Sequence, residues 1–268
     1  MGSLLAALAS YLDARCAGGA WLLRMEDIDP PREMPGAADR ILRSLEAHGL
    51  CWDESVLFQS TRRDAYEEAL RVLEEAGRVF ACCCSRATLG PGGSCLGRCK
   101  PRAGQPISLR IRLRGDTGFD DQILGLQPPV NTHSDLVLRR KDGLYAYALA
   151  VVVDDAWQGI NHVVRGSDLL LQTFAQLEIF RELAATAPQY AHLPLVRDTQ
   201  GTKLSKQTGA RAIDDAFAVD NLRSALRLLQ QDSADMPASS TGELLDLAVN
   251  NWRPRVLSAL AEKSLVYP

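Results

Sequence analysis

The sequence lacks a strong charge of either sign and any long apolar run. Its 268 residues carry 30 lysines and arginines against 33 aspartates and glutamates, a formal net charge of −3. General attraction to a polyanion is therefore excluded, so that any contact with RNA has to come from a local basic face. No uninterrupted apolar stretch has the length of a membrane span, and the start of the chain lacks the basic leader of a signal peptide. We therefore expect a cytoplasmic protein without membrane contact.

Several common catalytic patterns are also missing. The sequence contains no HExxH or GxGxxG motif, no internal repeat and no low-complexity tract, and its four histidines form no persuasive Ser/His/Asp arrangement. These absences give no support to a zinc protease, a dinucleotide-binding enzyme or a solenoid. The length allows one large domain or two modest ones.

What is present is an alternation of helix and strand patterns. Apolar spacing and glycine punctuation predict helices over residues 3–15, 36–48, 61–76 and 168–183. Buried strands are expected over 20–24 and 161–164, and an alternating strand over 108–114. An apolar run covers 147–153, and the segment after residue 214 reads as helical. Strands followed by helices of this size favour an α/β fold with a mainly parallel sheet.

Five of the seven cysteines lie between Cys82 and Cys99. Disulfides explain such crowding poorly in a cytoplasmic protein, and a metal site explains it better. Cys82, Cys84, Cys95 and Cys99 form a C-x-C pair and a C-x₃-C pair around a glycine-rich loop, a spacing that suits structural zinc. Cys83 is then the spare thiol. The alternative is a set of free thiols in a loop.

An acidic segment, 24–32, follows the first predicted strand and contains Glu26 and a Pro30-Pro31 pair. Ligands of open α/β sheets bind beyond the carboxyl ends of the strands, so that an acidic group at this position can hold a substrate amine. The alternative is a charged, proline-broken surface loop.

A second polar segment, 201–207, places Lys203 and Lys206 on either side of Ser205. Lysines in a loop that begins with glycine can neutralise charge on transferring phosphates. An exposed polar loop is the alternative for so short a match.

Arg165 follows the strand expected at 161–164, where it is well placed to bind a carboxylate through two hydrogen bonds. Tyr147 could close the same small polar pocket, and His192 could line a nucleotide pocket. A core tyrosine and a helix-capping ion pair are the plainer interpretations of Tyr147 and Arg165. The arginines of 108–114 share one strand face, which either contacts RNA or is solvated.

The order of these segments along the chain is far more specific than any one of them. Glu-Asp-Ile-Asp-Pro-Pro-Arg at 26–32, the cysteine loop, Tyr147, Val-Arg-Gly at 164–166 and Lys-Leu-Ser-Lys at 203–206 together resemble the class I glutamyl-tRNA synthetase family. The similarity extends over nearly the whole chain. It is strongest to the truncated glutamyl-Q branch, which keeps the catalytic domain and lacks the anticodon-binding domains.

The resemblance implies a Rossmann-type class I catalytic domain with a small zinc-binding insertion and a short helical C-terminal tail. We expect the first part of the catalytic domain at 1–78, the insertion at 79–102, the remainder of the domain at 103–213 and the helical segment at 214–268. Such a domain forms glutamyl-adenylate from L-glutamate and ATP with Mg²⁺. It then transfers the glutamyl group to queuosine in the anticodon of tRNA(Asp).

The resemblance also assigns roles to residues. Glu26 holds the amino group of glutamate, and Tyr147 and Arg165 complete the glutamate pocket, with the arginine on the side-chain carboxylate. Lys203 and Lys206 are the catalytic lysines, and Lys206 and Ser205 contact ATP. Zn²⁺ is held by Cys82, Cys84, Cys95 and Cys99. By analogy with the family we expect a monomer.

The chain departs from the family pattern at its start. Family members begin with a strand and a phosphate-binding turn, of which Met1-Gly2-Ser3 matches only the end. We favour a start codon assigned too far downstream over a truncation or a degenerate paralogue, and a chain that truly began here is expected to have little activity. The alternatives are therefore a glutamyl-tRNA synthetase fragment that charges a 3′ end, and an inactive zinc-bearing protein that binds tRNA.

Overall fold

The computed structural model describes residues 1–89, 93–130, 134–197, 213–260 and 265–266. Its α-helices are α1 (Gly2–Cys16), α2 (Ala37–Ala47), α3 (Arg63–Glu75), α4 (Arg86–Leu89), α5 (Tyr147–Gln158), α6 (Leu170–Glu182), α7 (Ala218–Leu228) and α8 (Thr241–Asn250). Its strands are β1 (Leu22–Met25), β2 (Asp53–Phe58), β3 (Val79–Cys82), β4 (Ser108–Arg112), β5 (Phe119–Asp121), β6 (Gly125–Gln127), β7 (Asp135–Arg139), β8 (His162–Gly166), β9 (Gln189–Leu193), β10 (Val196–Arg197) and β11 (Leu265–Val266). Short 3-10 helices cover Pro30–Arg32, Gln59–Arg62, Ser167–Leu169, Asp215–Phe217, Asp232–Asp235 and Pro254–Leu260.

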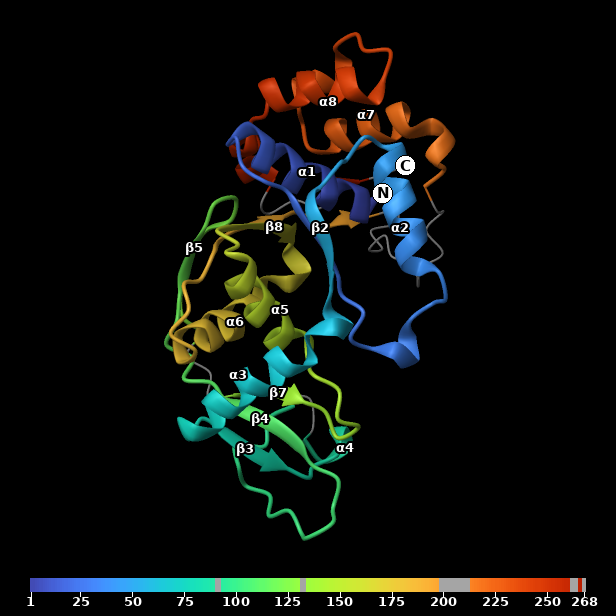
Figure 1. Ribbon diagram of the computed structural model, residues 1–268. Helices are drawn as coiled ribbons and strands as arrows, with labels where there is room; N and C mark the ends of the chain where they lie inside the picture. The colour runs from blue at the N-terminus through green and yellow to red at the C-terminus, as the bar shows by residue number, and fades with distance from the viewer. Residues whose placement is uncertain (90–92, 131–133, 198–212, 261–264, 267–268) are drawn as a thin grey trace.

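The parallel strand pairs expected of an α/β domain are present, but in separate short sheets. β1 pairs with β2, and β8 pairs with β9, each in parallel. The second of these sheets continues through β5 to β6, in the order β6-β5-β9-β8. An antiparallel sheet, β3-β4-β7, forms the opposite end of the molecule from α7 and α8 (Figure 1).

Helix α1 packs between β8 and the C-terminal helices α7 and α8. Leu5, Leu8 and Leu12 recur at helical spacing and are almost completely buried, in one core cluster with Leu222 of α7 and Leu244 of α8. Figure 1 shows these three helices packed together at the top of the view. The C-terminal segment is helical as predicted, except that Leu265–Val266 returns as β11 beside β10.

The apolar run at 147–153 lies in a helix, α5. Every residue from Ala148 to Val152 is buried, because α5 packs between α3 and α6 in a second core cluster. A helix that is surrounded by protein carries no amphipathic period, so its sequence resembles that of a buried strand. Gly159 ends it in the left-handed conformation, with φ of 66°.

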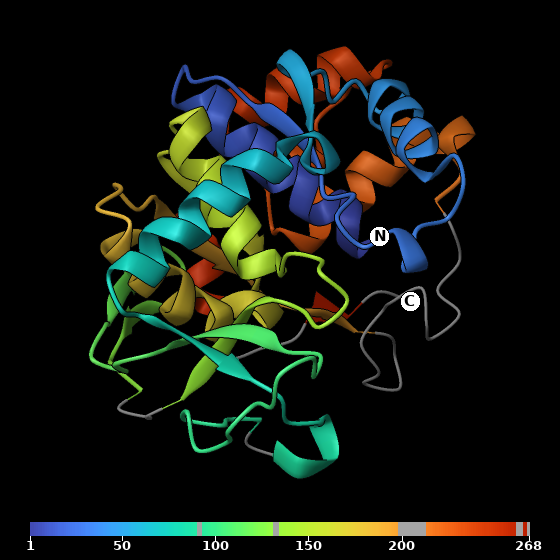
Figure 2. The same cartoon turned by 60° about the horizontal axis from the view of Figure 1, so that its bottom comes forward.

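The prediction that the arginines of 108–114 share one exposed strand face is wrong at Arg110. The Arg110 side chain is buried and forms an ion pair with Asp135 of β7, while Arg112 donates to the carbonyl of Leu96 at 3.1 Å. Arg114 forms an ion pair with Glu182 at 2.8 Å. In the rotated view of Figure 2, this sheet and the cysteine loop attached to it lie toward the viewer. These arginines are thus engaged within the protein rather than aligned as a free basic face.

Among the residues that the structure describes, no helix is long and apolar enough to cross a membrane.

Candidate functional site

Three residues predicted for substrate binding come from three different elements and converge. Glu26 directly follows β1, Tyr147 is the first residue of α5, and Arg165 lies within β8. They are close enough for the charges of Glu26 and Arg165 to act on Tyr147, and for the charge of Arg165 to act on Glu26. The structure therefore brings together side chains that are up to 139 residues apart in the sequence.

Glu26 is exposed to solvent at this convergence, with Arg24 close by. Although part of this side chain meets solvent, the protein around it desolvates the carboxylate and raises its pKa, while the positive charges of Arg24 and Arg165 oppose that rise. Arg24 does not pair with Glu26. It forms an ion pair with Asp155 of α5, with 2.8 Å between Nη2 and Oδ1, and donates to Gln158 at 2.9 Å. The carboxylate of Glu26 therefore accepts no hydrogen bond from Arg24.

Tyr147 contributes a hydroxyl that has no hydrogen-bond partner among the described residues. Desolvation, reinforced by the negative charge of Glu26, raises the pKa of Tyr147 to about 12. The phenol is therefore neutral throughout the physiological pH range and can donate a hydrogen bond to a ligand.

Arg165 is 9% exposed and is held from behind by three polar side chains. Its Nε–H donates to Nε2 of His192 at 3.2 Å. Its Nη2 donates to Oγ1 of Thr173 and to Oε1 of Gln176, each at 2.7 Å. The guanidinium also lies over the ring of Tyr190, 5.0 Å from the centroid.

The sequence suggested that His192 could line a nucleotide pocket. The structure contradicts this, because His192 is fully buried. Its ring lies between Arg165 and Asp121, and its Nδ1 is 2.5 Å from Oδ2 of Asp121. Burial favours a protonated Asp121, but hydrogen bonds from His192 and from backbone N–H groups outweigh it and lower the pKa of that carboxyl.

The four cysteines predicted as metal ligands form a compact group. The Sγ atoms of Cys82, Cys84, Cys95 and Cys99 all lie within 4.8 Å of one another, and those of Cys84 and Cys95 are 3.8 Å apart. Tetrahedral zinc with Zn–S bonds of about 2.3 Å requires sulfur atoms about 3.8 Å apart, so the arrangement fits this ion. The backbone N–H of Cys83 donates to Sγ of Cys99 at 3.4 Å and lowers the pKa of that thiol to about 6. A thiolate is thereby favoured at one corner of the group.

The ion pair between Arg110 and Asp135 ties this cysteine loop to the antiparallel sheet. Arg110 also donates to the carbonyl of Gly93 at 2.5 Å, and the backbone N–H of Leu96 donates to Asp135 at 2.5 Å. Both contacts flank Cys95. The loop is therefore held by charged hydrogen bonds on the side that faces the sheet.

Lys203, Ser205 and Lys206 lie outside the described residues.

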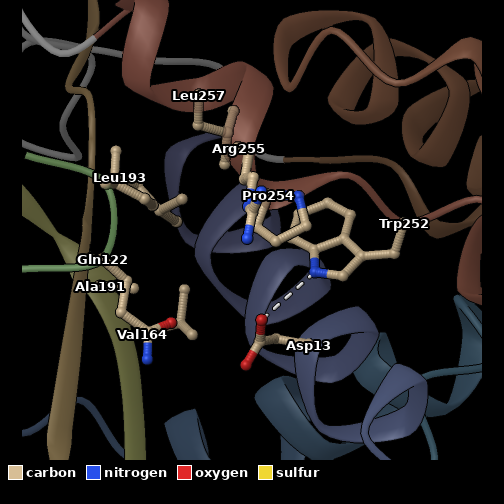
Figure 3. Close-up of a pocket in the computed structure, with 10 residues that line it drawn as sticks. Asp13, Gln122, Val164, Ala191, Leu193, Trp252, Pro254, Arg255 and Leu257 are labelled. Atoms are coloured by element: carbon tan, nitrogen blue, oxygen red, sulfur yellow. Dashed lines mark hydrogen bonds between the residues drawn. The ribbon is translucent and has the colours of Figure 1, made fainter.

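A separate cavity of about 280 Å³ lies between α1, β8, β9 and the C-terminal segment (Figure 3). Asp13, Val164, Leu193, Trp252 and Arg255 are among the residues that line it. The dashed line in Figure 3 is the hydrogen bond from Trp252 Nε1 to Asp13, 3.3 Å long. None of the described residues predicted for the site lines this cavity.

No sequence pattern predicted the residues that support the site. Asp121, Thr173 and Gln176 belong to no motif in the sequence. Thr173 and Gln176 lie three residues apart on α6, a spacing that places both on one helix face toward Arg165. The spacing indicates a shared role only when it is known that β8, which carries Arg165, lies beside this helix face.

The family described as tRNA synthetases class I (E and Q), catalytic domain, matches residues 1–91 and 98–229. The glutamyl-Q tRNA(Asp) synthetase of Escherichia coli (strain K12) is 45% identical over 272 residues, which cover 99% of this chain and 87% of that protein. The protein of the same name from Neisseria gonorrhoeae (strain ATCC 700825 / FA 1090) is 48% identical over 271 residues, with 94% and 90% covered.

Among solved structures, glutamate-tRNA synthetase from Elizabethkingia anophelis superposes with a TM-score of 0.81 at 22% identity. The match covers all of this chain and 65% of that chain, so the present chain spans slightly less than two thirds of the solved protein. At this identity the likeness shows the fold alone.

Proposed function

The chain belongs to the class I tRNA synthetase family of catalytic domains for glutamate and glutamine, and from this membership we propose that it activates L-glutamate with ATP and transfers the glutamyl group to queuosine in the anticodon of tRNA(Asp). The predicted fold class, a class I catalytic domain of mixed helices and strands, is confirmed. The protein is a ligase of the glutamate-activating type. The proposed role in tRNA modification rests on the similarity to glutamyl-Q tRNA(Asp) synthetases, which are 44–49% identical to this chain.

The glutamate pocket rests on three charged or polar groups of complementary kind. Arg165 offers N–H donors to the side-chain carboxylate, Glu26 accepts from the α-amino group, and Tyr147 donates from a neutral hydroxyl. The distribution of charge supports this orientation, because an amino acid has its cation at one end and this carboxylate at the other. Arg24 is engaged by Asp155 and forms no ion pair with Glu26.

For the chemical step we propose that Lys203 and Lys206 neutralise the phosphates of ATP bound with Mg²⁺, and that Ser205 contacts the nucleotide. Attack of the glutamate α-carboxylate on the α-phosphate forms the P–O bond of glutamyl-adenylate and releases pyrophosphate. Charge develops on the phosphate oxygens in that step, where a mobile ammonium stabilises it. A hydroxyl of queuosine then attacks the activated carbonyl and displaces AMP.

We further propose that Cys82, Cys84, Cys95 and Cys99 hold a structural Zn²⁺ within an insertion at 79–102. The packing of their sulfur atoms and the ties from Arg110 and Asp135 support the site. The ion would supply folding energy to a segment with few apolar residues and would take no part in the reaction. A monomeric state and a cytoplasmic location stay predictions.

The observation that carries the proposal is the convergence of Glu26, Tyr147 and Arg165 on one site in a chain of this family. ATP–pyrophosphate exchange on the full-length gene product tests the activation step. We expect exchange that depends on L-glutamate and is absent with L-glutamine or L-aspartate. Glutamate-independent exchange, or none from folded protein, contradicts the proposal and leaves the inactive tRNA-binding paralogue in its place.

A further inference from the structure

The guanidinium of Arg165 is fixed by a set of acceptors that use three of its five N–H protons. His192 takes the Nε proton, and Thr173 and Gln176 take the two Nη2 protons. Nη1 has no acceptor among the described residues, so its two protons are those available to a ligand carboxylate. The direction in which they point depends on the contacts at the other nitrogens.

Of these contacts, the one to His192 depends on the tautomer of an imidazole. Nε2 can accept from Arg165 only when it carries no proton, which requires the neutral ring to hold its proton on Nδ1. Nδ1 is 2.5 Å from Oδ2 of Asp121, where a carboxylate accepts that proton. Asp121 and His192 are both essentially without solvent exposure, at 1% and 0%, so water does not compete for either contact.

Asp121 is itself held in a single orientation. Its Oδ1 accepts from three backbone N–H groups, those of Ile123 at 3.0 Å, Leu124 at 2.9 Å and His192 at 3.2 Å. These three donors leave Oδ2 as the oxygen that faces the imidazole. The side chain of Asp121 therefore has one fixed acceptor, aimed at Nδ1 of His192.

We propose that Asp121 and His192 form a positioning pair, in which the carboxylate fixes the Nδ1–H tautomer and thereby orients Arg165 for the carboxylate of the amino-acid substrate. The inference rests on the proposed role of Arg165 in glutamate binding. Neither residue touches the substrate in this arrangement. In the other tautomer, Nε2–H can donate to Oγ1 of Thr173, 3.1 Å away and already an acceptor from Nη2 of Arg165. The Nε–H of Arg165 then loses its acceptor in a buried space, and the guanidinium is no longer held at that nitrogen.

Replacing Asp121 by asparagine tests the tautomer directly. The three backbone donors keep the amide oxygen at the Oδ1 position, so that the amide NH₂ replaces Oδ2 and faces Nδ1. An NH₂ donor there favours the Nε2–H tautomer, as loss of the orienting carboxylate does in catalytic triads. D121N is therefore expected to reverse the tautomer with little change in shape.

The first measurement reads the tautomer without any substrate. The chain has four histidines, so ¹⁵N-histidine labelling and a long-range ¹H–¹⁵N spectrum at neutral pH resolve them, and the signal missing from H192Q assigns His192. We expect Nδ1–H in the wild type and Nε2–H in D121N. An Nε2–H ring or an imidazolium in the wild type overturns the proposal, whether or not the protein activates glutamate.

The second measurement is the steady-state kinetics of glutamate activation. D121N is expected to raise the KM for glutamate about 10- to 100-fold, with the KM for ATP and kcat changed less than about threefold. H192Q places an amide oxygen near the position of Nε2 and should keep the glutamate KM within about threefold of wild type. H192N, the matched control, keeps a donor toward Asp121 and removes the acceptor for Arg165, so it should behave as D121N does.

A double-mutant cycle separates this role from a purely structural one. In the H192Q background no tautomer remains to be set, so D121N should raise the glutamate KM by less than about twofold. Equal effects of D121N in both backgrounds, or losses confined to kcat and stability, contradict the positioning role. Absence of activation in the wild type instead removes the proposed function, and the labelled spectrum still decides whether the pair exists.

Discussion

Arg24, at the end of β1, forms an ion pair with Asp155 of α5, with 2.8 Å between Nη2 and Oδ1. Both side chains are largely buried, with 16% and 6% of their surface exposed. The pair holds the strand against the helix that carries Tyr147. It also engages the guanidinium of Arg24, which lies close to Glu26 and forms no ion pair with it.

Asp155→Asn should therefore affect stability and binding together. Removing one partner leaves the guanidinium of Arg24 uncompensated, which is expected to cost roughly 3 kcal/mol of unfolding free energy. The released Arg24 should also pair with Glu26 and raise the KM for glutamate. Urea denaturation and pyrophosphate exchange measure the two effects. Glu75→Gln, which breaks an exposed arginine pair on α3, is the control and should change neither; equal behaviour of the two variants contradicts this account.

Glu26→Gln should reduce glutamate binding while it stabilises the protein without ligand. The folded state raises the pKa of Glu26, so the ionised carboxylate is less favourable in the folded than in the unfolded chain. This penalty is fully present above the raised pKa and disappears as the pH falls through the unfolded value. The melting temperature of the variant should exceed that of the wild type at pH 8, by a margin that shrinks toward pH 5. A variant that is less stable at pH 8 contradicts the assigned pKa direction.

Tyr147→Phe removes one hydroxyl and almost no packing. If this hydroxyl binds glutamate, its loss should raise the KM for glutamate roughly tenfold and leave the melting temperature unchanged. Because the pKa of Tyr147 is about 12, the wild-type KM should show no tyrosine ionisation below pH 10. Tyr145→Phe is the matched control: its hydroxyl donates to Glu67, so its loss should affect stability and spare the KM. A raised KM in Tyr145→Phe and an unchanged KM in Tyr147→Phe would contradict the placement of the glutamate pocket at Tyr147.

The zinc content of cysteine variants should distinguish the four proposed ligands from Cys83, the spare thiol. Protein purified without chelator should contain stoichiometric zinc by atomic emission. Cys95→Ser should lose the metal and lower the melting temperature, because one of four thiolates is replaced by a poor ligand. Cys83→Ser should retain zinc, since its side chain stands outside the group of four. Zinc retained by Cys95→Ser and lost by Cys83→Ser would show that the ligand set is different.

Local sequence patterns predicted those elements whose environment is asymmetric. Helix α1 and helix α3 each have one apolar face, and their predicted bounds differ from the observed ones by two residues or fewer. The nature of α5 could not be predicted in this way, because residues 148–152 are buried on every side of the helix and carry no amphipathic period. The burial of Arg110 was missed because alternation does not reveal an acidic partner on another strand.

The site was predictable where residues follow an ordered series of motifs, and unpredictable where they act through partners distant in sequence. Glu26, Tyr147 and Arg165 belong to the motifs, and the structure places them together. Asp121 and Gln176 support Arg165 from a strand and a helix that share no local signal with β8. Their roles follow from tertiary packing, which brings residues 44 and 11 positions from Arg165 to the same buried space.

The most direct test of the central claim is the destination of the glutamyl group. The full-length gene product is incubated with ATP, labelled glutamate and tRNA(Asp), either containing queuosine or transcribed without it, and the digested nucleosides are analysed by mass spectrometry. We expect ATP-dependent label on the queuosine nucleoside and none on the unmodified transcript. Label on the 3′-terminal adenosine, or equal labelling of both tRNAs, would contradict it and assign the chain to ordinary glutamyl-tRNA synthesis.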